Sequence, residues 1–131
     1  KLIHLNGITH MCLEDDGTLD KELISSLFIR NYSTYTNQDA LGILFYNSQE
    51  GFMYPVVYVE SIDQAIHERC CGSGSAAIAT ALSHQGKLSQ TLKINQPGGY
   101  LDVSVEYDNG KLKEIWIKGK VSIVAEGFAY I

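Results

Sequence analysis

The segment from about Gly74 to Gln85 limits the folds open to this chain more than any other. As a helix, it carries apolar residues around nearly its whole circumference: Ala76, Ala77, Ile78, Ala79, Ala81 and Leu82. A helix that is apolar on every side is a buried helix. Because its side chains are mostly small, strands can approach it closely. The rest of the chain is therefore expected to wrap around this helix.

Most of the remaining sequence is typical of strands. Apolar, β-branched or aromatic residues, or loose alternation, mark residues 2–13 (interrupted at Asn6-Gly7), 41–46, 56–59, 100–107, 111–118, 122–124 and 128–131. The turn Asp108-Asn109-Gly110 predicts a tight hairpin, since Asn-Gly accepts two positive φ angles. A shorter amphipathic helix precedes residue 31, with Leu19, Leu23 and Leu27 on one face and Ile24 and Phe28 beside it. We predict an α+β fold, with a curved, mostly antiparallel sheet wrapped around one central buried helix.

Composition restricts the class of protein further. Residues 1–131 suffice for a single domain, and 45% of them are hydrophobic. The net charge of −5, without any Lys/Arg cluster, argues against nucleic acid and anionic membranes as partners. The sequence has no apolar run of the ~20 residues that a membrane span needs. Three cysteines define no disulfide framework. These features favour a soluble protein of a reducing compartment, and we expect the cytoplasm.

A cysteine stands directly before the apolar helix, in the run Cys71-Gly72-Ser73-Gly74-Ser75. Glycines at a helix N-terminus let backbone N–H groups converge on an anion, and the helix dipole adds to the attraction. The same environment stabilises a thiolate, so the pKa of Cys71 is expected to fall. Residues 69–101 contain no Asp or Glu, which suits a region that receives a carboxylate ligand.

Other readings of this region fail on spacing. The pattern Gly72-x-Gly74-x-x-Ala77 lacks the downstream acid that would hold a ribose. A phosphate-binding P-loop lacks its Gly-Lys-Ser/Thr, and the hydrolase elbow lacks its Gly-x-Ser-x-Gly. His67, Cys70 and Cys71 would need a fourth ligand to hold zinc, so no metal site is predicted.

Four motifs together resemble a known family. Cys71-Gly-Ser-Gly-Ser75, Gln96-Pro-Gly-Gly99, Lys118-Gly-Lys-Val121 and Ala125-Glu-Gly127 occur in an order and spacing similar to the C-terminal half of the diaminopimelate epimerase family. The histidine-racemase branch is the most similar. The resemblance covers residues 40–131 well and residues 1–39 weakly.

The resemblance implies an amino-acid racemase or epimerase that uses neither pyridoxal phosphate nor a metal. Two thiols face opposite sides of the α-carbon; one removes the proton and the other returns a proton. Cys71 matches one of them, and a second lobe would supply the other. The chain would then be the C-terminal lobe of a two-lobed enzyme, with the last strand, about residues 125–131, pairing in the sheet of the missing lobe. The isolated chain is expected to be inactive, unless a homodimer uses Cys71 twice.

The resemblance also suggests substrate contacts for a free amino acid, either histidine-like or diaminopimelate-like. Gly72, Ser73, Gly74 and Ser75 would supply N–H donors to the carboxylate, and Asn37, Glu68, Arg69 and His10 resemble side chains that contact the substrate. Two alternatives stay open. One is an isomerase of the phenazine-biosynthesis type, which uses an acidic residue in place of the thiol. The other is an amino-acid-binding module without catalysis.

Overall fold

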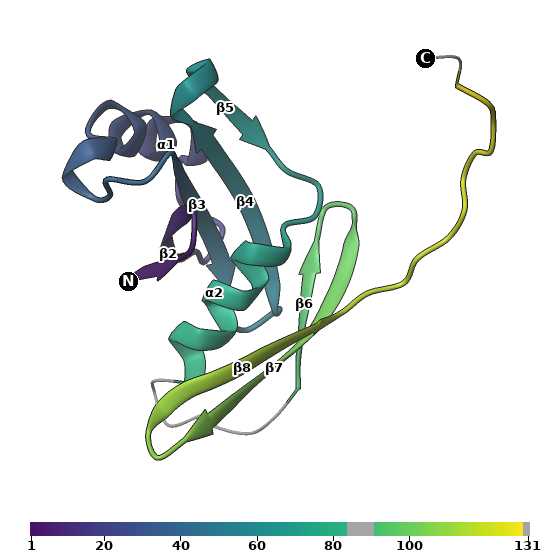
Figure 1. Cartoon of the computed structure of the whole chain (residues 1–131). Helices are drawn as coiled ribbons and strands as arrows, with labels where there is room; N and C mark the ends of the chain where they lie inside the picture. Colours follow the sequence, from purple (N-terminus) through teal and green to yellow (C-terminus); the bar gives the residue numbers. More distant parts are fainter. Residues whose placement is uncertain (84–90, 130–131) are drawn as a thin grey trace.

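The computed structural model describes residues 1–83 and 91–129, and its elements alternate between a sheet and two α-helices (Figure 1). In chain order they are β1 (Leu2–Leu5), β2 (Ile8–Glu14), α1 (Lys21–Arg30), a 3₁₀ turn (Tyr32–Thr34), β3 (Ala40–Asn47), β4 (Phe52–Val59), a second 3₁₀ turn (Glu60–Ile62), β5 (Gln64–His67), α2 (Gly72–Ser83), β6 (Leu92–Gln96), β7 (Gly99–Asp108) and β8 (Lys111–Lys118).

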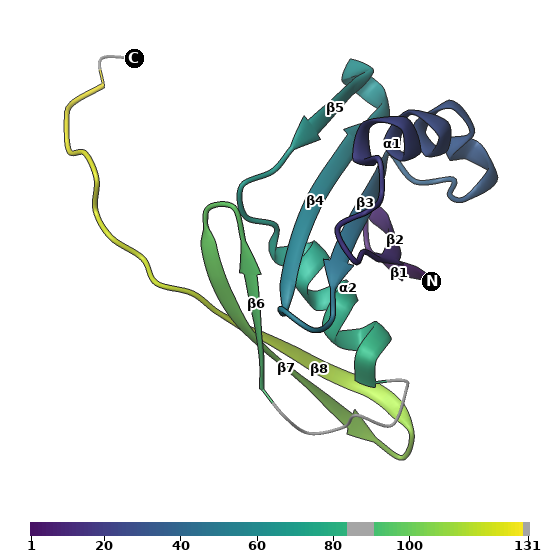
Figure 2. The same ribbon diagram turned by 180° about the vertical axis from the view of Figure 1, so that it is seen from behind.

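The described strands form one curled sheet in the order β1-β2-β3-β4-β6-β7-β8, with β5 also paired to β4. The pairs β2–β3 and β4–β6 are parallel, and the other pairs are antiparallel. Helix α2 lies in the hollow of the sheet, and α1 covers the opposite face (Figures 1 and 2). This arrangement confirms the predicted α+β class and the mostly antiparallel sheet around a central helix.

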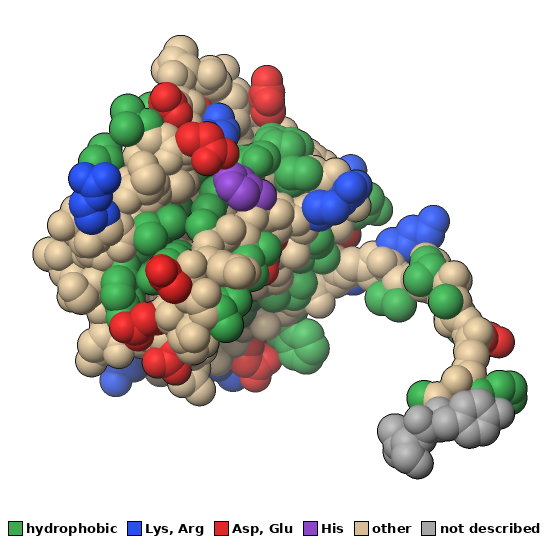
Figure 3. Space-filling model, turned by 90° about the horizontal axis from the view of Figure 1, so that it is seen from above, with side chains coloured by type: hydrophobic (Ala, Val, Ile, Leu, Met, Phe, Trp, Pro, Cys, Tyr) green, Lys and Arg blue, Asp and Glu red, His purple; other side chains and the backbone are tan. Residues whose placement is uncertain are grey.

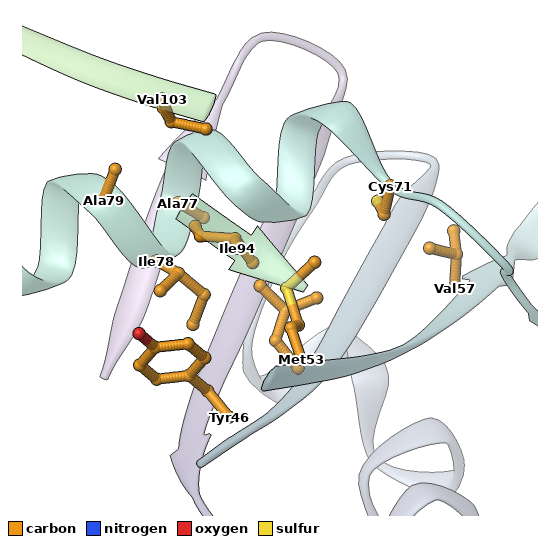
Figure 4. Packing of buried hydrophobic residues seen from close by; sticks show 10 residues of the cluster. Tyr46, Met53, Val57, Cys71, Ala77, Ile78, Ala79, Ile94 and Val103 are labelled. Carbon is orange, nitrogen blue, oxygen red and sulfur yellow. The ribbon is translucent and has the colours of Figure 1, made fainter. Parts of the chain in front are cut away.

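Helix α2 is buried because both halves of the curled sheet close on it. Ala77, Ala79 and Ile78 are at most 2% exposed. They pack with residues of β3, β4, β6 and β7: Leu44, Met53, Ile94 and Val103 (Figure 4). The predicted helix began at about Gly74, whereas α2 begins at Gly72. Positions 84 and 85 of the predicted helix lie outside the described residues.

Strand β3 is apolar at nearly every position because helices cover both of its faces. Leu41, Ile43 and Phe45 pack on the α1 side. Leu44 and Tyr46 pack on the α2 side. Since side chains alternate along a strand, a sheet that is covered twice requires this continuous apolar run.

Helix α1 buries only part of the apolar face that we predicted, since Leu19, Ile24 and Phe28 pack inward and two leucines do not. Leu23 and Leu27 are 56% and 48% exposed, whereas Ile24 and Phe28 pack against the β3 cluster. Neighbouring residues of a helix lie about 100° apart around its axis. The pair Leu23 and Leu27 and the pair Ile24 and Phe28 have the same spacing of four residues, so the periodicity does not show which pair is buried. Asp20 caps the helix by accepting the Leu23 N–H at 3.0 Å.

The backbone conformations of two turns follow from the residues of the turns themselves. The interruption at Asn6-Gly7 is a hairpin that reverses the chain between β1 and β2, with Gly7 at φ 84°. Asn109 and Gly110, between β7 and β8, have φ angles of 49° and 76°. Two consecutive positive φ angles are those of a type I′ turn, which confirms the hairpin predicted from Asn-Gly.

The segment after β8 does not form the strands that we predicted at residues 122–124 and from residue 128. Residues 119–129 have no regular structure and extend away from the lobe (Figure 3). Val121, Val124 and Phe128 are more than 90% exposed. A strand needs a neighbour for its N–H and C=O groups, and none of the described strands pairs with this segment. The pairing of residues 125–131 with the sheet of another lobe stays a prediction. Residues 130 and 131 lie outside the described residues.

Among residues 1–83 and 91–129, no helix is both long and apolar enough to cross a membrane.

Candidate active site

Cys71 is the last residue before α2, at the end of a short connection from β5. Its side chain turns into the hollow of the sheet beside Val57 (Figure 4), and the residue is 4% exposed. The neighbouring Cys70 is exposed instead. The predicted position of the cysteine at the N-terminus of the buried helix is therefore the one that the chain adopts.

The sulfur of Cys71 receives its hydrogen bonds from the first turn of α2. The Gly74 N–H donates to Sγ at 3.3 Å, and Ser73 Oγ lies 3.5 Å from Sγ. A Cβ atom at position 74 would be 3.1 Å from this sulfur and 2.9 Å from Leu44 Cδ2. Glycine at position 74 therefore allows the helix to approach both the sulfur and the sheet.

A second set of hydrogen bonds holds the backbone of Cys71. Its N–H donates to Gln96 Oε1 at 2.6 Å. Gln96 Nε2 donates to Ser75 Oγ at 3.0 Å, and that hydroxyl donates to the Cys71 carbonyl at 2.8 Å. Ser75 is fully buried and Gln96 is 4% exposed. These bonds form a closed ring through three residues on two elements.

Only part of the expected N–H donor set is free. The Gly74 N–H is bonded to the sulfur, and the Ser75 N–H donates to the Cys71 carbonyl at 3.1 Å. In the described part of the chain, the N–H groups of Gly72 and Ser73 have no partner. An anion at this helix end would meet these two donors and the positive end of the α2 dipole.

The pKa of Cys71 is raised to about 11, not lowered as the sequence led us to expect. Burial of the sulfur is the largest cause, and the Glu68 carboxylate raises it further. The hydrogen bonds from Ser73 and Gly74 lower the pKa, but by less. At neutral pH the residue is therefore a thiol, because desolvation of the thiolate outweighs the donors of the helix end.

Glu68 and Arg69 adjoin the cysteine, but neither makes an ion pair within the described residues. Glu68 is half-buried, and its N–H donates to the Pro55 carbonyl at 3.0 Å. Arg69 is exposed, and its carbonyl accepts the Gly98 N–H at 2.6 Å. The Glu68 carboxylate hydrogen-bonds with the Cys71 thiol, whereas the Arg69 side chain is exposed beside the site.

Among the described residues, neither Asn37 nor His10 is hydrogen-bonded to Cys71. Asn37 is exposed in the loop before β3. His10 is fully buried on β2, and neither ring nitrogen has a hydrogen-bond partner among the described residues. The ring of His10 therefore has no exposed surface in this lobe. For both residues, the substrate contact that we expected stays a prediction.

The predicted absence of a metal site rested on a missing fourth ligand. His67 Nδ1 lies 3.1 Å from the Tyr54 hydroxyl, and Nε2 lies 3.6 Å from the Glu22 carboxylate. In residues 1–83 and 91–129, no three His, Cys, Asp or Glu side chains cluster in a way that could hold a metal ion.

Sequence reasoning missed the contribution of Gln96. In the sequence, Gln96-Pro-Gly-Gly99 served only as one motif of the resemblance, yet its first residue binds the cysteine backbone. The available signal was alternation: Ile94 and Gln96 lie two residues apart on a strand and share a buried face. A polar residue on a buried face requires partners.

The fold is that of the diaminopimelate epimerase-like proteins, including the phenazine-biosynthesis branch. The crystal structure of the Bacillus anthracis phenazine biosynthesis protein of the PhzF family matches with a TM-score of 0.50. The match has 15% sequence identity and covers 85% of this chain and 34% of that chain.

A family model identifies the branch. Residues 1–130 match the family described as the histidine racemase CntK N-terminal domain, and the chain belongs to this family. The histidine racemase of Fusobacterium nucleatum (strain ATCC 23726) is 32% identical over 133 residues, which cover 99% of this chain and 48% of that protein. The histidine racemase of Staphylococcus aureus (strain Mu50) is 29% identical over 115 residues, which cover 87% of this chain and 42% of that protein. The chain thus spans about half the length of these curated relatives.

The matched family is an N-terminal domain, which differs from the C-terminal half suggested by the motifs. The resemblance on which we relied implies two lobes that each bear a cysteine at a helix N-terminus.

Proposed function

We propose that this chain is one lobe of a cofactor-independent histidine racemase and that Cys71 is one of its two catalytic thiols. A single observation carries the proposal: in a chain that matches the histidine racemase family over residues 1–130, a buried cysteine stands at the N-terminus of a buried helix beside two free N–H groups. The substrate is proposed from the names of the relatives, and the second thiol is proposed to come from another lobe.

The proton transfers follow from the state of Cys71. A thiolate on the other lobe removes the α-proton, and the electron pair of the broken C–H bond stays on the α-carbon. The Cys71 thiol then gives its proton to the opposite face, which inverts the centre and leaves Cys71 as a thiolate. The reverse reaction exchanges the two roles. In the direction described, Cys71 is the proton donor, which agrees with the protonated form that burial of its sulfur favours.

The helix end has a separate task in this proposal. The substrate carboxylate accepts the N–H groups of Gly72 and Ser73, and the dipole of α2 favours the negative charge that spreads onto it as the carbanion forms. No side-chain cation is needed for this step. Glu68 and Arg69, at the rim, are placed to meet the polar end of the substrate side chain.

Deuterium exchange tests the proposal on the full-length protein that contains this chain. The α-hydrogens of L-histidine, D-histidine, diaminopimelate and the common amino acids are followed by NMR in D₂O. We expect exchange and racemisation of histidine, lost on Cys71→Ser and retained in the matched variant Cys70→Ser. Unchanged racemisation in Cys71→Ser would overturn the role of the thiol. Binding by calorimetry without exchange would favour an amino-acid-binding module.

A further inference from the structure

We propose that Gln96 is a positioning residue for the Cys71 thiol, acting through a hydrogen-bond ring closed by Ser75; the inference rests on the catalytic role proposed for Cys71. The ring comprises three bonds, of 2.6, 3.0 and 2.8 Å. It joins β6 to the connection that leads into α2.

The donors and acceptors of the ring can be assigned in only one way. The Cys71 N–H can only donate, so the oxygen of the Gln96 amide faces it. The amide nitrogen then faces Ser75 Oγ and donates to it. The Ser75 hydroxyl is left to donate its own hydrogen to the Cys71 carbonyl. Every donor in the ring therefore faces an acceptor. An amide and a hydroxyl can do this because each offers both a donor and an acceptor.

The consequence for Cys71 is geometric. The ring fixes the peptide group before its Cα and the peptide group after it, and therefore both φ and ψ. The sulfur then has a single remaining torsion, and the Gly74 N–H at 3.3 Å holds it in one well. The ring also occupies the Cys71 N–H, so that the open donors of the helix end are those of Gly72 and Ser73.

The turn that follows Gln96 supports the same connection. The Gly98 N–H donates to the Arg69 carbonyl at 2.6 Å, and a Cβ atom at position 98 would lie 2.9 Å from that oxygen. Residues 69 and 71 are thus both held by the segment from Gln96 to Gly98. The sheet therefore dictates where the sulfur lies relative to the helix end.

The test compares Gln96→Met, which keeps the size of the side chain and removes both polar atoms, with Ser75→Ala. The matched control is Asn95→Leu, since Asn95 lies on the same strand and its Nδ2 donates to the Gly51 carbonyl at 3.4 Å, away from Cys71. Histidine racemisation by the full-length protein gives kcat and KM. Alkylation of Cys71 by iodoacetamide, in a background with Cys12 and Cys70 replaced by serine and read by mass spectrometry of the Cys71 peptide, reports the position of the thiol without turnover.

We expect Gln96→Met to lower kcat about 10- to 100-fold, the effect of a misplaced catalytic group, with KM changed less than about threefold. Cys71 alkylation at pH 9 should rise at least about fivefold as the sulfur loses its buried position. The double variant with Ser75→Ala should be no slower than the slower single variant, because both break one ring. Asn95→Leu should leave kcat and alkylation unchanged.

The measurements distinguish a failure of the positioning role of Gln96 from a failure of the proposed racemase function. A Gln96→Met protein that melts at a lower temperature but keeps the wild-type kcat and alkylation rate would overturn the positioning role. A wild-type protein that racemises no amino acid, while Gln96→Met still accelerates alkylation, would overturn the proposed function and leave the ring as the positioning device. If Gln96→Met does not fold, Ser75→Ala decides the same questions, because it breaks the ring at the Cys71 carbonyl.

Discussion

The imidazole of His10 occupies the space that a side chain at position 42 would need. A Cβ atom on Gly42 would lie 1.9 Å from His10 Nδ1 and 2.5 Å from Cε1. The two residues are register partners on the parallel strands β2 and β3. The glycine therefore lets a ring from one strand lie over the backbone of the next, on the face of the sheet that packs against α2.

Gly42→Ala should destabilise the lobe because the ring of His10 cannot stay where it is. Overpacking of a full core typically costs about 1–3 kcal/mol, and a contact this short places the variant at or above the upper end. Urea unfolding followed by circular dichroism measures the loss. The double variant with His10→Ala should recover part of it, because the small side chain removes the clash. A Gly42→Ala protein as stable as the wild type would contradict the packing described here.

Stability should fall as the pH is lowered from about 6.5 to 4. Burial lowers the pKa of His10 from its usual 6.5 to about 4. In this window the unfolded chain binds a proton that the folded chain does not, so the free energy of unfolding decreases as the pH falls. At about 1.4 kcal/mol per pH unit, the loss by pH 4 is about 3 kcal/mol.

Urea unfolding at several pH values measures this effect. His10→Phe, which cannot titrate, is the control and should flatten the profile between pH 6.5 and 4. An equal loss of stability in both proteins would show that another group is responsible. Hydrogen bonds and the charge of Lys21 lower the pKa of Asp15 from 3.8, so protonation of Asp15 reduces the free energy of unfolding mainly below pH 4.

Cys71 should be slow to alkylate at neutral pH. Its thiolate fraction rises tenfold per unit until the pH reaches the raised pKa of about 11. With Cys12 and Cys70 replaced by serine, the iodoacetamide rate should climb steadily from pH 7 to 10 in the folded protein. In denaturant the same rate should level off near pH 9. A plateau by pH 8 in the folded protein would contradict a buried thiol.

Removing residues 121–131 should leave the stability of the described lobe within about 0.5 kcal/mol of the wild type, because the described part of this segment packs against so little. Chemical unfolding of the 131-residue and 120-residue chains makes the comparison. A chain ending at residue 110 is the contrasting variant. It lacks β8, whose Ile115 packs against the α2 cluster, and should lose most of its stability. A large loss in the 120-residue chain would place the tail inside the lobe.

Local chemistry explains which expectations were confirmed. Asn109-Gly110 defines its turn through backbone angles that few other residues accept, so the hairpin needed no tertiary information. The apolar circumference of α2 could only be buried, and the need to cover it implied a curled sheet. In the same way, the run Cys71 to Ser75 indicated where the buried helix begins; that its end receives an anion stays a prediction.

The expectations that failed depended on distant residues. The prediction for α1 was wrong only for Leu23 and Leu27, because helical periodicity does not say which edge of a wide apolar face will meet β3. Residues 122–124 have strand propensity but no strand beside them. The pKa of Cys71 rose because the hollow of the sheet removes water from the sulfur, a cost that no sequence pattern records.

By itself, the sequence determined the class of the fold, the buried helix and the cysteine at its N-terminus, since these follow from periodicity and local backbone preference. Only the tertiary structure decided which donors are free, how Gln96 reaches Cys71 across 25 positions of sequence, and that the thiol is protonated at rest. The physical reason is that hydrogen-bond partners and desolvation depend on what lies nearby in space, whereas periodicity reports only what lies nearby along the chain.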